Sequence, residues 1–121
     1  MARIVIVEDD PLVAMGVKIY LESRDHQIIG VATSGEQAVT VALQDAPDLV
    51  LMDVRLKGGI DGVEAAKRIL AHRAIPIIFV SGSGEPQTVG RIKALRPAGL
   101  LLKPVTPADL AAEVERVAAT V

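Results

Sequence analysis

Short apolar runs alternate with stretches of helical periodicity along this chain, and the alternation limits the fold more than any other feature. The apolar runs predict strands at residues 3–7, 27–32, 48–52, 75–80 and 100–102. The periodic stretches predict helices at residues 11–23, 34–44, 61–72, from the loop at 81–86 to about 95, and from 107 onward. Strands that alternate with helices predict an α/β fold, in which a doubly wound parallel sheet carries helices on both faces.

The apolar side chains are mostly small and branched, which favours a sheet that is buried on both faces. Half of the 121 residues are apolar, 23% are charged, and Tyr20 and Phe79 are the two aromatic residues. This length and composition predict one globular domain over residues 1–121.

Helix starts are marked by residues that cap the free N–H groups of a first turn. Asp10 is expected to be the N-cap of the first helix, Asp61 that of the third and Thr106 that of the last. Ser34 is followed three residues later by Gln37, a spacing typical of a capping box.

Charge and composition also exclude several classes of protein. The net charge is −2, and no basic run of the kind that binds nucleic acid is present. Without cysteine the chain has no disulfides, and His26 and His72, far apart in sequence, are predicted to be surface residues. Neither a signal peptide nor a membrane span is predicted, so a cytoplasmic protein with a native start at Met1 is expected.

Polar side chains follow the predicted strands at their carboxyl ends, where open α/β sheets bind their ligands. They are Glu8, Asp9, Asp10, Asp53, Ser81 and Lys103. Like charges about 4 Å apart repel by roughly 4 kcal/mol at an effective dielectric constant of about 20. A cluster that holds this many carboxylates therefore needs protons, a cation or a catalytic task.

These residue types are suited to phosphoryl transfer. Carboxylate oxygens are preferred ligands of Mg²⁺, and a carboxylate such as Asp53 is also a nucleophile that forms aspartyl phosphates. Lys103 offers a positive charge to a phosphoryl oxygen, and Ser81 offers a hydroxyl hydrogen bond. A phosphatase of the haloacid dehalogenase type also uses such a nucleophile, but it needs a second Asp at the position of Arg55.

The chain resembles the receiver domains of bacterial two-component response regulators over nearly all of its length. The resemblance lies in five segments that follow one another in the family's order: IVIVEDDP (4–11), DLVLMD (48–53), DG (61–62), IIFVSG (77–82) and GLLLKP (99–104). It implies a flavodoxin-like sheet with the strand order 2-1-3-4-5.

The resemblance also implies roles for single residues. Asp53 matches the phospho-acceptor, and Glu8 and Asp9 match the acid pair that binds Mg²⁺. The backbone carbonyl of Arg55 is expected to be a further metal ligand. Ser81 matches the switch hydroxyl.

Lys103 matches the phosphate-sensing lysine of the family, and a cis peptide bond to Pro104 is expected behind it. Leu100 stands where most relatives have an aromatic residue on the fifth strand, so the output is predicted to be a shift of the loop at 81–86 and of the helix after it. The loop at 56–60 is one residue longer than the commoner form, and Arg55 and Ser83 occupy positions that tune phosphoryl lifetime in the family.

The implied partners are a sensor histidine kinase or phosphotransfer protein, which donates the phosphoryl group, and a downstream protein target. A receiver of this kind catalyses its own aspartyl phosphorylation, and the face around the fourth helix and fifth strand is expected to change. A monomer or weak homodimer is expected. The alternative is a phosphorylation-independent protein-binding module whose acid site is vestigial, which the missing aromatic residue favours.

Overall fold

The computed structural model describes residues 1–82 and 84–120. They form a parallel five-stranded sheet with the order β2-β1-β3-β4-β5, the flavodoxin-like order that the sequence resemblance implies. The strands are β1 (Arg3–Val7), β2 (Gln27–Ala32), β3 (Leu49–Asp53), β4 (Ile77–Ser81) and β5 (Gly99–Leu102). The helices are α1 (Pro11–Ser23), α2 (Gly35–Asp45), α3 (Gly62–Leu70), α4 (Pro86–Ala94) and α5 (Pro107–Ala118).

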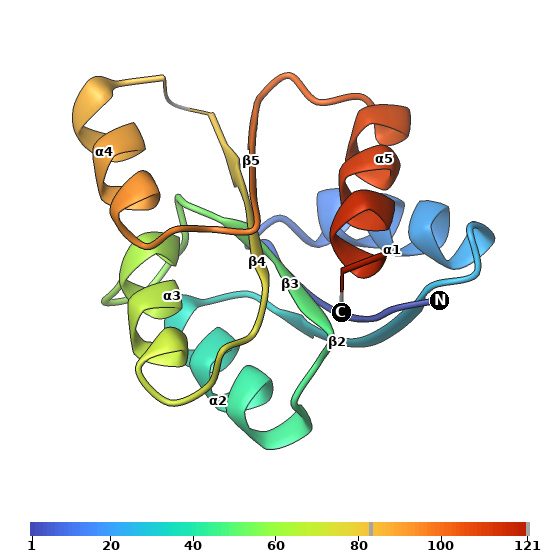
Figure 1. Ribbon diagram of the computed structural model, residues 1–121, viewed down its shortest axis with the longest axis horizontal. Coiled ribbons are helices and arrows are strands. Elements are labelled where there is room, and N and C mark those ends of the chain that lie inside the picture. Colours follow the sequence, from blue (N-terminus) through green and yellow to red (C-terminus); the bar gives the residue numbers. More distant parts are fainter. Residues whose placement is uncertain (83, 121) are drawn as a thin grey trace.

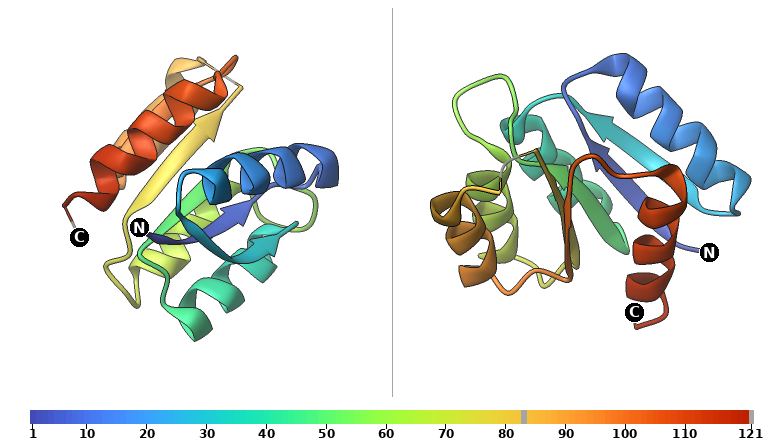
Figure 2. Two further views of the ribbon diagram at one scale, coloured as in Figure 1. Left: turned by 90° about the vertical axis from the view of Figure 1, so that its right-hand side faces the viewer. Right: turned by 90° about the horizontal axis from the view of Figure 1, so that it is seen from above.

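Helices cover both faces of the sheet, as predicted for a doubly wound fold (Figure 1). Helices α1 and α5 lie on one face and α2, α3 and α4 on the other, and the views in Figure 2 show the same division. Each face has its own core. One contains Phe79 and Ile69, and the other contains Leu21 and Val114.

The ends of three strands, β3, β4 and β5, differ from the sequence prediction by one or two residues. Strand β4 begins at Ile77 and not at Ile75, because Pro76 has no N–H for the sheet, although its carbonyl accepts from the Val50 N–H at 3.0 Å. Strand β3 extends to Asp53, which pairs with Val80 of β4. The acid that seemed to follow the strand is therefore its last residue.

The predicted N-caps are all present. The side chains of Asp10, Asp61 and Thr106 each accept a hydrogen bond from the first turn of α1, α3 and α5. Ser34 Oγ accepts from the Gln37 N–H at 3.1 Å, but Gln37 Oε1 accepts from the N–H of Thr33 and not from that of Ser34. The second hydrogen bond of the capping box, from the backbone back to the Gln37 side chain, is thus donated by Thr33, one residue before the N-cap.

The prediction that His26 is a surface residue was wrong. His26 is only 7% exposed, and its Nδ1 accepts a hydrogen bond from the Ala2 N–H at 3.2 Å. Its Nε2 lies 3.5 Å from Oε2 of Glu115 on α5. His26 thus links the start of β1 to α5, whereas His72 is exposed as predicted.

None of the helices within the described residues combines the length and the apolar character that a bilayer-spanning segment needs.

Candidate functional site

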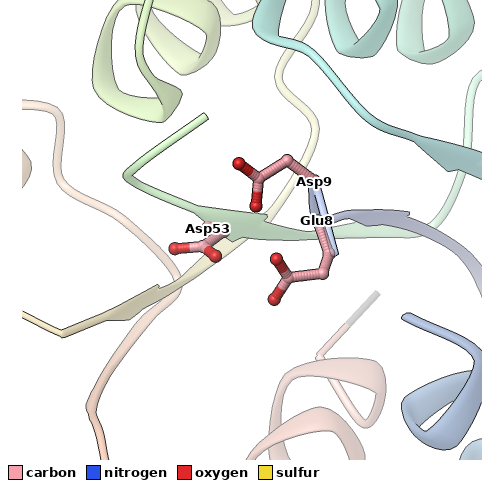
Figure 3. Close-up of side chains that lie close together, drawn as sticks. All are labelled: Glu8, Asp9 and Asp53. Atoms are coloured by element: carbon pink, nitrogen blue, oxygen red, sulfur yellow. The ribbon is translucent and has the colours of Figure 1, made fainter. Parts of the chain in front are cut away.

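Three carboxylates meet where β1 and β3 end. Each of Glu8, Asp9 and Asp53 offers an oxygen, and these oxygens lie within 4.8 Å of one another. Figure 3 shows the three side chains gathered at the ends of the two strands. The proximity follows from the fold, because β1 and β3 are neighbouring parallel strands in which Val7 pairs with Met52.

The cluster is poorly hydrated for a group of acids. Asp53 is 7% exposed and Glu8 9% exposed. Burial raises the pKa of Glu8 to about 7, and the nearby negative charge of Asp53 and a hydrogen bond with Asp9 act in the same direction. Hydrogen bonding to the Asp10 N–H and the charge of Lys103 oppose the rise. A carboxyl group that is removed from water and lies beside other acids holds its proton to a higher pH than an exposed one.

Lys103 supplies the cation nearest to Asp53 among the described residues. Its Nζ lies 3.3 Å from Asp53 Oδ2, and it stands one residue beyond β5. The Lys103 N–H donates to the carbonyl of Ser81 at 2.8 Å, which fixes the backbone beside the end of β4. The peptide bond between Lys103 and Pro104 is cis, as the sequence resemblance implies.

The other predicted site residues lie around this cluster. Ser81 is the last residue of β4 and is 1% exposed, and Arg55 lines the same cleft as Glu8, Asp53 and Lys103. Leu100 pairs with Phe79 across β4 and β5 and packs against the core on the side of α4. Its side chain thus packs against the core, at the position where the resemblance to receiver domains leads us to expect an aromatic ring in most relatives.

Asp10, also named in the sequence analysis, contacts the cluster through its backbone N–H, which donates to Glu8 Oε2 at 3.1 Å. Asp10 caps α1 through bonds to the N–H groups of Leu12 and Val13, as predicted. Ser83 lies outside the described residues.

Sequence reasoning missed the contacts that three residues make beside the site. Gly62 packs so closely on Asp53 that a Cβ atom there would clash with the Asp53 carbonyl oxygen. Arg91 of α4 forms a bidentate pair with Asp61, with distances of 2.9 and 3.2 Å. Glu36 of α2 accepts from the Gly59 N–H at 3.0 Å. Only Gly62 had a local signal, since a glycine directly after a cap residue permits close approach of the backbone.

An apolar cleft opens from the acid cluster between α1 and α5. Its lining includes Leu12, Val13 and Ile19 of α1 and Leu110 of α5, together with the site residues. Among the described residues, seven large apolar side chains are exposed, and four of them lie on α1: Leu12, Val13, Met15 and Ile19. Helix α1 therefore presents an apolar surface to solvent beside the carboxylates.

The sequence profile of the response regulator receiver domain matches residues 4–115. This chain belongs to that family. The receiver is 38% identical to the receiver domain of a modulated diguanylate cyclase from Desulfovibrio desulfuricans, with a TM-score of 0.90 over 99% of this chain and 95% of that one. The five-stranded order is thus a shared property of the fold.

Among curated relatives, the receiver is 34% identical to the phyllosphere-induced regulator PhyR of Methylorubrum extorquens, over 94% of this chain and 42% of PhyR. It is 33% identical to the transcriptional regulatory protein PdtaR of Mycobacterium tuberculosis, over 93% of this chain and 55% of PdtaR. The chain thus spans about half the length of these relatives.

Membership of the family places the receiver among the signalling modules of two-component systems. Receivers take part in phosphorelay with a kinase or phosphotransfer partner, and they generally bind Mg²⁺ at an acidic pocket. The donor set fits that ion, because carboxylate oxygens are hard ligands and the cluster is short of positive charge.

Proposed function

We propose that this receiver accepts a phosphoryl group on Asp53 from a phosphohistidine donor and passes the signal to another protein. The observation that carries the proposal is the convergence of Glu8, Asp9 and Asp53 within 4.8 Å, with Lys103 Nζ at 3.3 Å from Asp53. Acids alone would repel a phosphoryl group. An acid cluster that also contains a lysine is suited to accept one.

In the proposed reaction, an oxygen of Asp53 attacks phosphorus and forms a new P–O bond. The P–N bond of the donor breaks, and its electron pair leaves with the imidazole, which is then protonated by solvent. Lys103 neutralises charge that develops on a phosphoryl oxygen, and Ser81 offers its hydroxyl to another. Phosphoryl transfer needs positioning and charge neutralisation more than proton transfer, and these residues supply both.

Glu8, Asp9, Asp53 and the backbone carbonyl of Arg55 are the proposed ligands of Mg²⁺. When bound, the ion supplies positive charge that reduces the repulsion between these carboxylates and the incoming phosphoryl group. Burial raises the pKa of Glu8, so this carboxyl has to lose its proton before it can bind the ion, and a bound cation would favour its ionised form.

We also propose that the phosphodonor docks on α1. A phosphohistidine side chain is carried by another protein, so a contact surface is needed beside Asp53. The exposed apolar residues Leu12, Val13 and Met15 lie on α1, and two of them share the cleft with the carboxylates. Burial of such side chains against a partner is worth about 25 cal/mol per Å² of apolar area, a main source of affinity at interfaces.

For the output we propose a change on the face of α4 and β5. Ser81 lies at the end of β4, and the following loop leads directly to α4. Leu100 already packs in the core with Ile92 of α4, so no ring has to swing inward on phosphorylation. The proposed change is a shift of the loop at 81–86 and of α4, which a downstream protein then recognises.

The test is the intact mass after incubation with acetyl phosphate and Mg²⁺. The wild type is expected to gain one phosphoryl group, and the Asp53→Asn variant none. Asp10→Asn is the matched control, because it removes a neighbouring acid while asparagine still caps α1. This control is expected to be phosphorylated like the wild type. An unmodified wild type would refute the proposal and favour a binding module that works without phosphate.

A further inference from the structure

The loop between β3 and α3 is docked onto the start of α2, a contact between segments more than twenty residues apart in the sequence. Ser34 and Lys57 form an isolated parallel bridge. Two residues further along each segment, the Gly59 N–H donates to Glu36 Oε2 at 3.0 Å. The tip of the loop, around Gly59, is therefore held by the first turn of α2.

Glycines allow this close approach on both sides of the contact. A Cβ atom on Gly35 would lie 2.6 Å from Cγ1 of Ile60 and 3.0 Å from its carbonyl oxygen. Gly58 has a φ of +104°, and a Cβ atom there would lie 2.9 Å from Glu36 Oε1. The pair Gly58-Gly59 thus gives the Glu36 carboxylate access to the loop backbone.

The same loop carries Arg55, whose carbonyl is the proposed backbone ligand. At its other end, the Gly62 N–H donates to the Val54 carbonyl at 2.8 Å, which closes the base of the loop. The bond from Gly59 to Glu36 closes the tip. A loop that is fixed at both ends loses less conformational entropy when a cation binds than a free loop does.

We infer that Glu36 is a positioning residue for the metal site: by holding Gly59, it limits the motion of the loop that carries the Arg55 carbonyl, the proposed backbone ligand. This inference rests on the metal ligands of the proposed function. Glu36 acts through the loop backbone and does not itself touch the ion.

The test compares Glu36→Ala, which removes the acceptor, with Glu36→Gln, which removes the charge but keeps an acceptor oxygen. Mg²⁺ affinity is measured by calorimetric titration, and exchange of the Gly59 amide is measured by NMR without metal. Glu36→Ala is expected to weaken Mg²⁺ binding about three- to tenfold and to speed Gly59 exchange, since a hydrogen bond to a charged group is lost. Glu36→Gln is expected to stay within about twofold of the wild type.

A third readout separates positioning from a merely structural role. In acetyl phosphate reactions, Glu36→Ala is expected to raise the half-saturating Mg²⁺ concentration while the rate at saturating Mg²⁺ is unchanged. Glu22→Ala, which removes one charge from the exposed side of α1, is the control and is expected to leave all three values unchanged.

Wild-type Mg²⁺ affinity in Glu36→Ala would overturn the inference, whether or not Gly59 exchange changes, and so would equal losses in Glu36→Ala and Glu36→Gln. If the wild type binds Mg²⁺ but gains no phosphoryl group, the proposed function fails while the role of Glu36 is still measured by affinity and exchange. A wild type that binds no Mg²⁺ would overturn the inference together with the proposed metal ligands.

Discussion

Nζ of Lys103 lies 3.3 Å from Oδ2 of Asp53, and this ion pair joins the end of β5 to the end of β3 inside the acid cluster. Asp53 is buried, whereas the Lys103 side chain is 42% exposed. The lysine is therefore held by its partner more than by packing. We propose that it interacts with a negative charge that appears beyond the carboxylate.

The first prediction concerns the lysine itself. Lys103→Ala is expected to slow phosphorylation by acetyl phosphate about tenfold or more, because a charge aimed at the developing phosphoryl oxygens is lost. Lys93→Ala, which removes a lysine of α4, is the control and is expected to react at the wild-type rate. The measurement is the rate of phosphoprotein formation at saturating Mg²⁺. Equal rates for Lys103→Ala and the control would contradict the proposed role.

The second prediction follows from the raised pKa of Glu8, about 7 in the folded protein against a model-compound value of 4.5. Between these values the folded state binds more protons than the unfolded state, so the free energy of unfolding falls as the pH rises through this window. Without divalent metal, the wild type is expected to lose stability from pH 4.5 to 7 relative to Glu8→Gln. Urea unfolding of both proteins across this range measures the difference.

An opposite slope, or the same slope in both proteins, would show that Glu8 is not protonated near neutrality. Added Mg²⁺ is expected to flatten the wild-type slope, because the bound cation favours the ionised carboxyl.

The third prediction uses two glycines at helix positions with opposite surroundings. Gly62→Ala is expected to lower the free energy of unfolding by about 2 kcal/mol or more, because its Cβ would clash with the Asp53 carbonyl, which cannot move without disturbing the sheet. Gly16→Ala on α1, where a Cβ atom meets nothing within 4 Å, is expected to raise that free energy by about 0.5–1 kcal/mol. Denaturant unfolding of both variants is the measurement. A Gly62→Ala protein as stable as the wild type would contradict the close packing described here.

The fourth prediction concerns the pair of Asp61 and Arg91, which joins the cap of α3 to α4. Burial opposes ionisation of Asp61, but hydrogen bonds from the Arg91 guanidinium and the Glu64 N–H outweigh it and hold the pKa of Asp61 below its usual value. The ionised Asp61 carboxylate stabilises the folded protein at a pH above the pKa of this group in the unfolded chain. This stabilisation is lost as the pH falls through the lowered pKa of Asp61 in the folded protein. Arg91→Ala is expected to shift the midpoint of that loss to higher pH.

An NMR titration of the Asp61 carboxyl carbon measures this shift directly. Arg68→Ala breaks the exposed pair with Glu64 on α3 and is the control, with no expected change at Asp61. The same midpoint in Arg91→Ala and the wild type would show that the ion pair does not control the titration.

Much of the fold was predictable because its determinants are local. The N-caps at Asp10, Asp61 and Thr106 act within one helical turn, and the apolar runs need only their own sequence to predict strands. The acid site was also predictable in outline, because parallel strands bring their carboxyl ends to one edge of the sheet.

The missed features depend on contacts between distant segments. Burial of His26 requires the start of β1 and the end of α5, and the bond from Gly59 to Glu36 requires a loop to fold back on a helix. In each of these contacts, the sequence around one partner does not indicate the other partner. Side-chain contacts of this kind are decided by tertiary packing, which a periodic pattern does not specify.

We propose that Asp53 alone carries the phosphoryl group, and this can be tested by locating the acyl phosphate on the chain. After reaction with acetyl phosphate and Mg²⁺, borohydride reduction converts a phosphorylated aspartate to homoserine, which peptide mass spectrometry then finds by position. We expect homoserine at position 53 and unchanged residues at positions 8 and 9. A reduction product at any other acid, or at none in the wild type, would contradict the assignment of Asp53 as the phospho-acceptor.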